Sequence, residues 1–469
     1  MSARATVDHS ERLPATKLFP WAGAGFSAAA NFIILSYVAI YATDTLQLSP
    51  AIVGVLILVS NICNAVCGLL AAWIVDRSPE TRWGKARPYE FAVIGLWLAT
   101  WLLFSTPAGL SEPGRLIWVF VTFITLNALF DTFLRANDSL YLARAFSGRR
   151  LFAKLTTRSG LITTIGSMIV SITLPLMLDI AGKSPEGWSL TVLIFSVPLA
   201  IIGMMRFVFI KEVNTTSDTG AAPVKISEIG TALRADKWIF LLAGVQVAAS
   251  AVTGANVAAY YFRYVVGNLS LLGIMAALGV IVLPAILVLP RLMKRWAISQ
   301  IIMGGALLGL LGSITYAFAG SNLSILTVGA ILTALAILPI SYLMTVMVLD
   351  LASYNEWKGQ RRLESTLSTI VGVAGKLGMG FAGLITGQVL AASGYDGSKA
   401  AQETSAVAAI VGLYSWFPAF LFAVIFVLIM IYGRFDRTIL PQVHDDLEAL
   451  TRDSEVPTGP TASSSRPTA

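Results

Sequence analysis

Apolar stretches of about 20 residues recur along the whole chain and are separated by short polar segments. A helix needs about 20 apolar residues to cross the hydrocarbon core of a bilayer. The pattern therefore predicts twelve transmembrane helices, numbered as spans 1 to 12. They cover residues 19–43, 51–75, 89–106, 115–141, 155–178, 189–210, 238–262, 270–290, 297–319, 323–349, 365–392 and 406–432.

One polar segment, residues 211–237, is longer than the other loops and divides the spans six and six. We expect an all-α membrane protein whose two six-helix bundles face each other across a substrate path, because transporters of this plan bind solute where the halves meet. The predicted parts are an N-terminal tail (1–18), the two bundles (19–210 and 238–432), the central loop (211–237) and a C-terminal tail (433–469). The C-terminal tail ends in a stretch rich in Ser, Thr and Pro and is expected to be largely disordered.

The composition excludes a soluble enzyme. Only 13% of the 469 residues are charged, whereas a soluble domain carries about 25%. The two histidines lie in the tails, and the two cysteines, Cys63 and Cys67, have no further metal-ligating residue nearby. Because the spans contain neither a nucleophile beside a base nor a metal cluster, we expect no enzymatic activity, no metal and no resident cofactor.

The basic residues are distributed unevenly between the two sides of the membrane. With both termini in the cytoplasm, only four of the 33 lysines and arginines fall on the outer side and two lie inside spans. Cytoplasmic loops carry an excess of Lys and Arg, so this predicts a multi-pass plasma (inner) membrane protein with both ends inside. We expect the bilayer and a small solute as partners, no nucleic acid, and a monomer. The four outer residues are Arg115, Lys183, Arg263 and Lys399.

Several polar side chains lie inside the spans, where they normally face the bundle interior. Span 7 carries a helical stripe that includes Gln246, Thr253 and Asn256, while Asn64 lies in span 2 and Tyr342 in span 10. Two interpretations stay open, because small hydroxyl side chains also hold helices together without touching a solute. We list all five as candidate solute or ion contacts.

Charged residues inside the spans are more informative. Asp131, Arg135 and Asp138 are spaced i, i+4 and i+7 in span 4, so they share one helix face and can pair along it. Lys376 lies near the middle of span 11, where an ammonium needs a carboxylate partner or a wet cavity. A static ion-pair network between helices is the alternative to a role in transport.

Four sequence motifs, in the right order along the chain, resemble the glycoside–pentoside–hexuronide:cation symporters, the melibiose-permease branch of the major facilitator superfamily. They are Tyr41-Ala-Thr43-Asp44, then Asp76-Arg77 followed by Arg82-Trp83-Gly84-Lys85, then Asp350-Leu-Ala-Ser-Tyr354-Asn-Glu356-Trp357, and finally Lys376 followed by Gly394-Tyr395. The resemblance implies a fold of the major facilitator type, alternating access, and a sugar carried together with Na⁺, Li⁺ or H⁺.

The resemblance also suggests roles for single residues. Lys376 resembles the family's lysine near the cation site, Asp131 its sugar-binding aspartate, and Arg158 the arginine beside that aspartate. The chain departs from the family where Asn64 and Gly68 replace the two cation-binding aspartates of span 2. It also departs at Ala28, where span 1 would offer a carboxylate, and at Phe133, where a proline usually follows the span 4 aspartate.

The leading hypothesis is a symporter for a small polar solute, a sugar or glycoside. Alternatives are the same fold carrying an amphipathic solute (a lysolipid or a terpenoid- or steroid-like acid) and a non-transporting membrane sensor. The missing aspartates favour H⁺ over Na⁺ as the coupling ion, since a proton needs only one titratable group. Predicted coupling residues are Asp131, Asn64 and Lys376. Predicted solute contacts are Asp131, Arg158, Gln246, Thr253, Asn256, Tyr342 and Lys376. A predicted cytoplasmic gate comprises Arg149, Arg150, Asp350, Glu356 and Glu364, and Arg158 on the same side is a further candidate for pairing with these acids.

Overall fold

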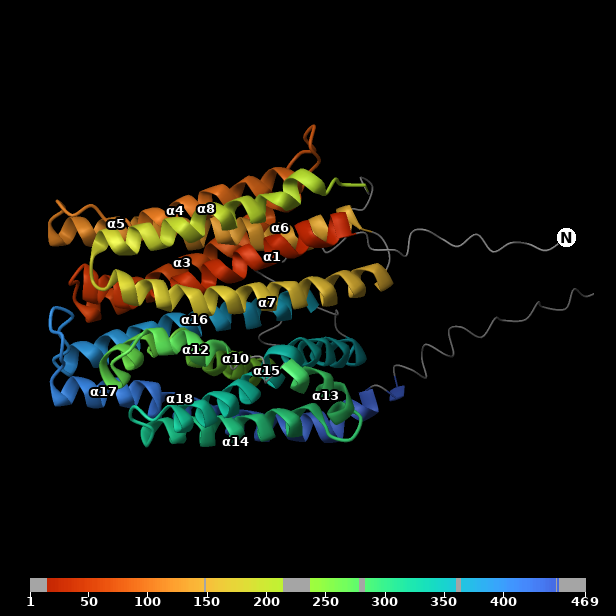
Figure 1. The fold of residues 1–469 in the computed structure, drawn as a ribbon. Helices are drawn as coiled ribbons and strands as arrows, with labels where there is room; N and C mark the ends of the chain where they lie inside the picture. Colours follow the sequence, from red (N-terminus) through yellow and green to blue (C-terminus); the bar gives the residue numbers. More distant parts are fainter. Residues whose placement is uncertain are drawn as a thin grey trace, which may run out of the picture.

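The computed structural model describes residues 15–146, 149–213, 237–277, 283–359, 364–443 and 445–446. The regular elements in these residues are helices, and they form two bundles that lie side by side with their long axes roughly parallel (Figure 1). The first described residues of α1 and the last of the C-terminal helix lie at the same end of the molecule, called here the terminal end (Figure 1). The other end is called the distal end.

The first bundle contains spans 1 to 6. Span 1 consists of α1 (Ala15–Leu35), α2 (Val38–Ile40) and the π-helical turn η2 (Tyr41–Thr45). Span 2 is α3 (Pro50–Arg77), and span 3 is η3 (Arg87–Phe91) with α4 (Ala92–Leu103). Span 4 joins α5 (Glu112–Ile124), the π-helical turn η4 (Thr125–Asp131) and α6 (Thr132–Ala145). Spans 5 and 6 are α7 (Arg149–Ala181) and α8 (Pro185–Phe209).

The second bundle contains spans 7 to 12. Span 7 is α10 (Trp238–Gly254), α11 (Ala258–Tyr261) and η5 (Phe262–Val266), and span 8 is α12 (Ser270–Ala277) with α13 (Leu283–Met293). Spans 9, 10 and 11 are α14 (Ile298–Ala317), α15 (Leu323–Trp357) and α16 (Glu364–Ala392). Span 12 is α17 (Thr404–Tyr414), α18 (Trp416–Arg434) and η7 (Phe435–Ile439).

Each predicted span coincides with helices over most of its described residues, and residues 278–282 of span 8 lie outside the described residues. Ten helical stretches among the described residues are long and apolar enough to cross a membrane, and the shorter spans 3 and 8 complete the predicted twelve. Several helices run past the predicted boundaries, as α15 does by reaching Trp357, because a helix can continue into water once it leaves the apolar core. Most of the predicted central loop and tails lies outside the described residues.

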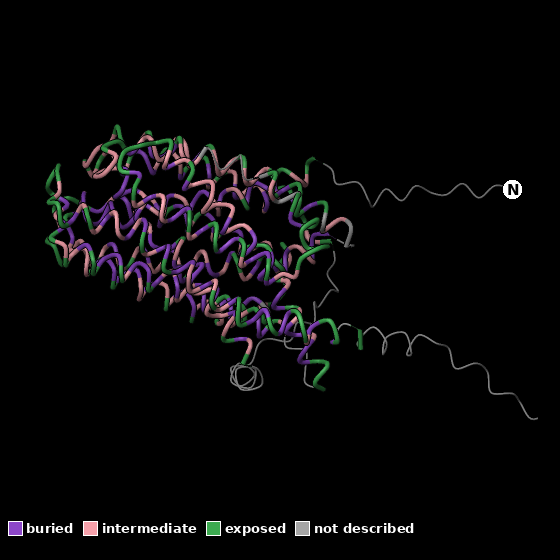
Figure 2. The backbone as a smooth tube through the Cα atoms, turned by 90° about the horizontal axis from the view of Figure 1, so that it is seen from below, coloured by how far each residue is buried: buried purple, intermediate pink, exposed green. Residues whose placement is uncertain are grey.

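The outward surface of the bundles is apolar, as a bilayer requires. Large side chains such as Ile117, Ile201 and Phe420 are more than half exposed, whereas buried positions concentrate between the helices (Figure 2). Exposed apolar surface on this scale would be unstable in water and is stable against lipid tails. The chain is therefore a multi-pass membrane protein.

The bundles contact each other mainly through α3 against α16 and α7 against α12. Glycines allow the first of these contacts: a methyl group at Gly54 would press on the Gly383 carbonyl, and one at Gly380 would meet Leu58. Small residues of this kind let membrane helices approach closely. Gly380 and Gly383 of span 11 therefore allow the close packing of α16 on α3.

Near the terminal end, a carboxylate binds the loop that follows span 2. Glu212 accepts hydrogen bonds from the backbone N–H groups of Lys85 (3.1 Å), Ala86 (2.7 Å) and Arg87 (2.9 Å), and it pairs with Arg144 at 3.0 Å. Burial raises the pKa of Glu212, but these donors outweigh it and hold the pKa below its usual value. The left-handed backbone of Gly84 (φ 102°) leaves room for this carboxylate, which gives the Arg-Trp-Gly-Lys motif a structural role.

Candidate functional site

A cavity of about 700 Å³ lies between the two bundles. Its walls come from span 1, span 2, span 4, span 7 and span 11, with one residue of span 5. The polar side chains in its lining are Ser36, Asn61, Asn64, Asn127, Asp131, Arg135, Ser167, Gln246, Ser250, Asn256 and Lys376. The volume and the mix of amides, hydroxyls and charges suit a small polar molecule.

Asp131 occupies the last position of the π-helical turn in span 4 and pairs with Arg135 at 2.7 Å. The predicted pairing along this helix is therefore present for these two residues. Asp138 does not join them, because it pairs at 2.6 Å with Arg206 of α8, which also binds the buried Glu90. A side chamber of about 300 Å³ inside the first bundle connects the two groups of charges, since both Asp131 and Arg206 line it.

Lys376 reaches across the interface from α16 to α3. Its ammonium donates to the side-chain oxygen of Asn64 and, at 3.2 Å, to the backbone carbonyl of the same residue. Thr132 donates to the same side-chain oxygen at 3.1 Å. Within the described part of the chain no carboxylate lies within ion-pair distance of this ammonium. The cavity thus holds two cationic side chains, Arg135 and Lys376, and one carboxylate, Asp131.

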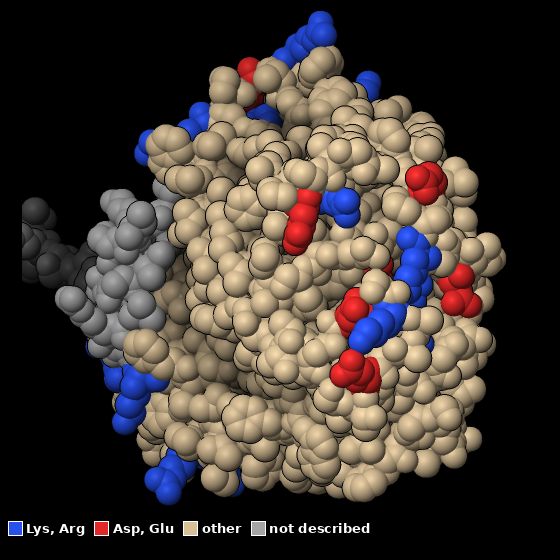
Figure 3. All heavy atoms as spheres, turned by 90° about the vertical axis from the view of Figure 1, so that its left-hand side faces the viewer, with Lys and Arg blue, Asp and Glu red and all other residues tan. Residues whose placement is uncertain are grey.

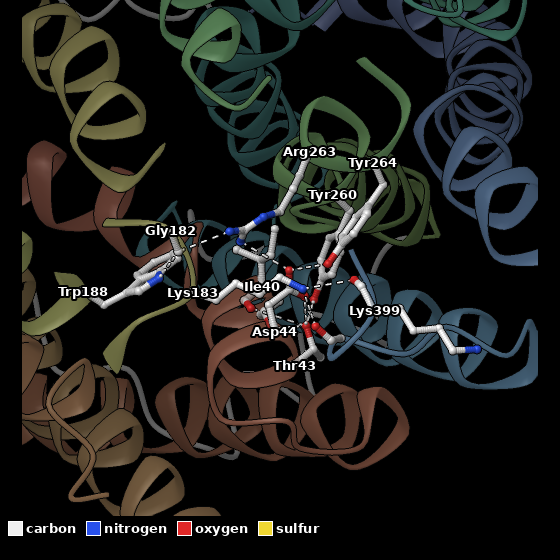
Figure 4. Close-up of polar contacts among 12 residues, drawn as sticks. Ile40, Thr43, Asp44, Gly182, Lys183, Trp188, Tyr260, Arg263, Tyr264 and Lys399 are labelled. Atoms are coloured by element: carbon white, nitrogen blue, oxygen red, sulfur yellow. Dashed lines mark hydrogen bonds and ion pairs between the residues drawn. The ribbon is translucent and has the colours of Figure 1, made fainter. Parts of the chain in front are cut away.

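At the distal end the halves are joined through Asp44, whose side chain is fully buried. The hydroxyl of Tyr264 donates to it at 2.6 Å, the hydroxyl of Tyr395 donates to its other oxygen, and the Arg263 guanidinium lies 3.3 Å away. Asp44 belongs to the first bundle and all three partners to the second. Figure 4 shows Arg263 and Tyr264 reaching Asp44 from the opposite bundle. We call this group the distal clamp.

Neighbouring contacts extend the distal clamp across the interface. Thr43 and Tyr260 share a hydrogen bond of 2.9 Å, and Lys183 donates to the Gly397 carbonyl at 2.5 Å. Arg263 also donates to the Gly182 carbonyl at 3.2 Å. The surface of this end carries few charged side chains, several of them with an opposite charge beside them (Figure 3). The bundles are therefore closed against each other at the distal end.

The structure brings together five of the predicted functional residues and leaves others apart. Asp131, Asn64, Lys376, Gln246 and Asn256 all line the central cavity. The remaining predicted solute contacts lie elsewhere: Thr253 lines a separate pocket described below, Tyr342 is 54% exposed on α15, and Arg158 is exposed on α7.

The predicted cytoplasmic gate is described only in part. Asp350 and Glu364 are half-buried and Glu356 is exposed, all near the terminal end where α15 ends and α16 begins. The side chains of Arg149 and Arg150 lie outside the described residues. Pairing between these groups stays a prediction.

Sequence reasoning missed the distal clamp. In the sequence, Asp44 stands out only as part of a motif, Arg263 and Lys183 only as rare outer cations, and Tyr395 only as the end of a motif. The available signal was that the few outer cations sit close in sequence to tyrosines and to an aspartate at span ends. Nothing local showed that they meet, because the contacts join residues more than 200 positions apart.

Two helical bundles around a central cavity, closed at one end by contacts between the halves, are typical of a secondary transporter of the major facilitator type. Solved structures share this fold. A nucleoside transporter, NupG, superimposes with a TM-score of 0.63 at 12% identity over 89% of this chain and 99% of its own. A bacterial homologue of the lysosomal transporter Spinster gives 0.67 at 14% identity over 90% and 97%.

The chain belongs to the MFS/sugar transport protein family, whose model matches residues 20–433. It is 30% identical to the isoprimeverose transporter of Lactiplantibacillus pentosus, over 95% of this chain and 93% of that one. It is 26% identical to the inner membrane symporter YicJ of Escherichia coli (strain K12), over 85% and 87%. Membership makes it a transporter of the major facilitator type and not an enzyme.

Replacing Asp44 by Asn is expected to loosen the distal clamp, because the charge that binds Arg263 is lost. Hydrogen bonds to charged groups contribute about 1.5–3 kcal/mol, so opening at this end should rise by about tenfold or more. The measurement is the labelling rate of a cysteine at Ser36, with Cys63 and Cys67 replaced by Ala, by a membrane-impermeant maleimide applied from the distal side. Glu403→Gln, which breaks an exposed pair within one bundle, is the control and should leave the rate unchanged. An unchanged rate in Asp44→Asn would rule out the clamp.

Proposed function

We propose that the protein is a symporter that carries a sugar or glycoside across the inner membrane by alternating access, as a monomer with both termini in the cytoplasm. The observation that carries the proposal is the central cavity, closed on the distal side by Asp44 and lined by Asp131, Asn64 and Lys376. With the termini inside, the distal end is the outer face, so the present conformation is closed to the outside.

The sugar assignment has two supports. The cavity offers a carboxylate and several amides and hydroxyls, which are the groups that hydrogen-bond to sugar hydroxyls. Among the relatives, one transports isoprimeverose by name, and that transporter matches nearly the whole chain. In this proposal Asp131 holds sugar hydroxyls while Arg135 positions its carboxylate, and Gln246 and Asn256 contact the solute from the opposite bundle.

The coupling ion in this proposal is a proton. In the resembling family, span 2 holds the cation with two aspartates, and here Asn64 and Gly68 stand at those positions. The ammonium of Lys376 occupies the oxygens of Asn64, so a positive charge tethered to the chain already fills the place where a free cation would bind. A Na⁺ ion there would be repelled by the ammonium. In this proposal Asp131, the carboxylate of the cavity lining, carries the proton.

The cytoplasmic gate belongs to the same proposal. When the terminal end closes, acidic residues at the junction of α15 and α16 pair with basic residues at the start of α7. Charges at such an interface bias a two-state equilibrium when they are partly desolvated. Arg158, further along α7, and Glu364, at the start of α16, are the pair chosen to test it.

Proton coupling is tested by uptake into proteoliposomes. A pH gradient, acidic outside, is expected to drive accumulation of a transported sugar such as isoprimeverose, equally with and without Na⁺. Asp131→Asn should abolish this accumulation while sugar exchange across the membrane at equal concentration persists, because the variant binds sugar but cannot carry the proton. The matched control is Asp179→Asn, on an exposed carboxylate of α7 that accepts a bond from Ser270. Uptake that requires Na⁺ and does not depend on the pH gradient contradicts proton coupling. Uptake that is inhibited by amphiphiles but not by sugars contradicts the sugar assignment.

The gate is tested by exchanging charges. Arg158→Glu and Glu364→Arg are each expected to slow uptake severalfold, and the double variant should recover most of the wild-type rate because the opposite charges are restored across the interface. Initial uptake rates in proteoliposomes, normalised to protein content, provide the measurement. If the uptake rate of the double variant is lowered by the product of the factors that the two single variants show, this pair does not form the gate.

A further inference from the structure

A second cavity of about 240 Å³ lies in the outer half of the second bundle, between the central cavity and the distal clamp. We call it the annex. Its walls come from spans 7, 8, 9, 10 and 12, with Ser36 and Tyr37 of span 1 closing one side. Ser36 and Asn256 line both the annex and the central cavity, so the two spaces adjoin.

Three membrane spans are interrupted at the annex. Span 1 breaks at Ser36 and Tyr37, between α1 and α2, and both residues line the annex. In span 7, α10 ends at Gly254 and α11 begins at Ala258, and between them Asn256 has a left-handed backbone (φ 51°) that residues other than glycine seldom adopt. In span 12, the helix breaks at Ser415, and both Tyr414 and Pro418 beside the break line the annex. Irregular backbone at membrane depth occurs where it lines a cavity, and broken helices mark binding sites in transporters.

The chemistry of the annex differs from that of the central cavity. None of its lining residues, all of them described, is charged. Tyrosine rings form part of the wall, with the centroids of Tyr316 and Tyr414 4.6 Å apart, and the Tyr316 hydroxyl bonds to Thr333 at 3.1 Å. Aromatic walls with a few convergent hydroxyls are typical of sites for uncharged, partly polar ligands.

Within the described part of the chain, the Ser313 hydroxyl in the annex has no hydrogen-bond partner. Ser313 of α14 is fully buried, lines the annex and makes no side-chain hydrogen bond. An unpartnered buried hydroxyl costs stability unless something binds it. Thr253, singled out in the span 7 stripe yet absent from the lining of the central cavity, faces the same space.

We propose that the annex is the subsite for an uncharged sugar ring, so that the solute is a two-ring glycoside with its other ring against Asp131 in the central cavity. This inference rests on the proposed transport of sugars and specifies the class of sugar. Ser313 hydrogen-bonds to a ring hydroxyl, and the tyrosines pack against the apolar face of the ring.

The test measures binding to the purified full-length protein by titration calorimetry, independently of transport. The probes are melibiose, lactose, maltose and cellobiose, together with their components glucose and galactose. At least one disaccharide is expected to bind wild type about tenfold or more tightly than its component monosaccharides. Ser313→Ala should weaken that disaccharide about three- to tenfold and leave the monosaccharides unchanged. Ser313→Leu, which fills the annex, should weaken it more than about tenfold.

The matched control is Ser60→Ala. Ser60 of α3 is also fully buried and has no hydrogen-bond partner among the described residues. It is absent from the lining of the central cavity, the side chamber and the annex. Removing the Ser60 hydroxyl should change neither the affinity for disaccharides nor the affinity for monosaccharides. If wild type binds disaccharides and their component monosaccharides with equal affinity, the annex is not a sugar subsite. The same conclusion follows if Ser313→Leu weakens the binding of both equally. Neither result contradicts the proposed transport of sugars. Absence of binding by every sugar in the panel contradicts the proposed function itself.

Discussion

A buried carboxylate inside a membrane protein must find its partners within the protein, and for Asp44 the charged and phenolic partners belong to the opposite bundle. The two halves consequently cannot separate at the distal end without leaving Asp44 and Arg263 unpaired. Breaking a buried pair costs more than its formation contributes, since an isolated charge remains in a medium of low polarity. The distal clamp therefore holds one end shut, and it sets which side of the membrane the central cavity can exchange with in this conformation.

The central cavity follows a different electrostatic rule. Arg135 is balanced by Asp131, whereas the Lys376 ammonium is held by the neutral oxygens of Asn64. A cation held only by dipoles is held less firmly than one held by a carboxylate. Asp131 acts electrostatically on both basic side chains, so the environment of this carboxylate and the contact of α16 with α3 are physically connected. This connection is what a symporter requires.

Much of the fold was predictable because lipid imposes a simple code. The length of each apolar stretch predicts a membrane span. Polar side chains are unfavourable in lipid, so those within the spans are expected to face the interior of the protein. The structure has five of them around one cavity: Asp131, Lys376, Asn64, Gln246 and Asn256. The comparison with known families confirms the sugar-transporter family that the motifs suggested.

Other features depend on geometry that no local pattern contains. Asp138 shares a helix face with Asp131, yet it pairs with Arg206, because Arg135 is already committed to Asp131 and α8 supplies a closer cation. The annex arises from helix breaks at Ser36, Asn256 and Ser415, which interrupt stretches that read as continuous apolar spans. The surroundings of Asp44 come from segments far apart in the sequence.

The most direct measurement is the distance between spin labels across each end of the interface, in lipid, with and without transported sugar. One pair joins Glu112 to Ala401 at the distal end, and the other joins Arg82 to Lys294 at the terminal end, all four exposed. If the distal clamp and the terminal gate alternate, the distal pair starts short and lengthens as the terminal pair shortens, and Asp44→Asn shifts the populations the same way without sugar. Distances that stay fixed at both ends while sugar is transported would contradict alternating access governed by Asp44.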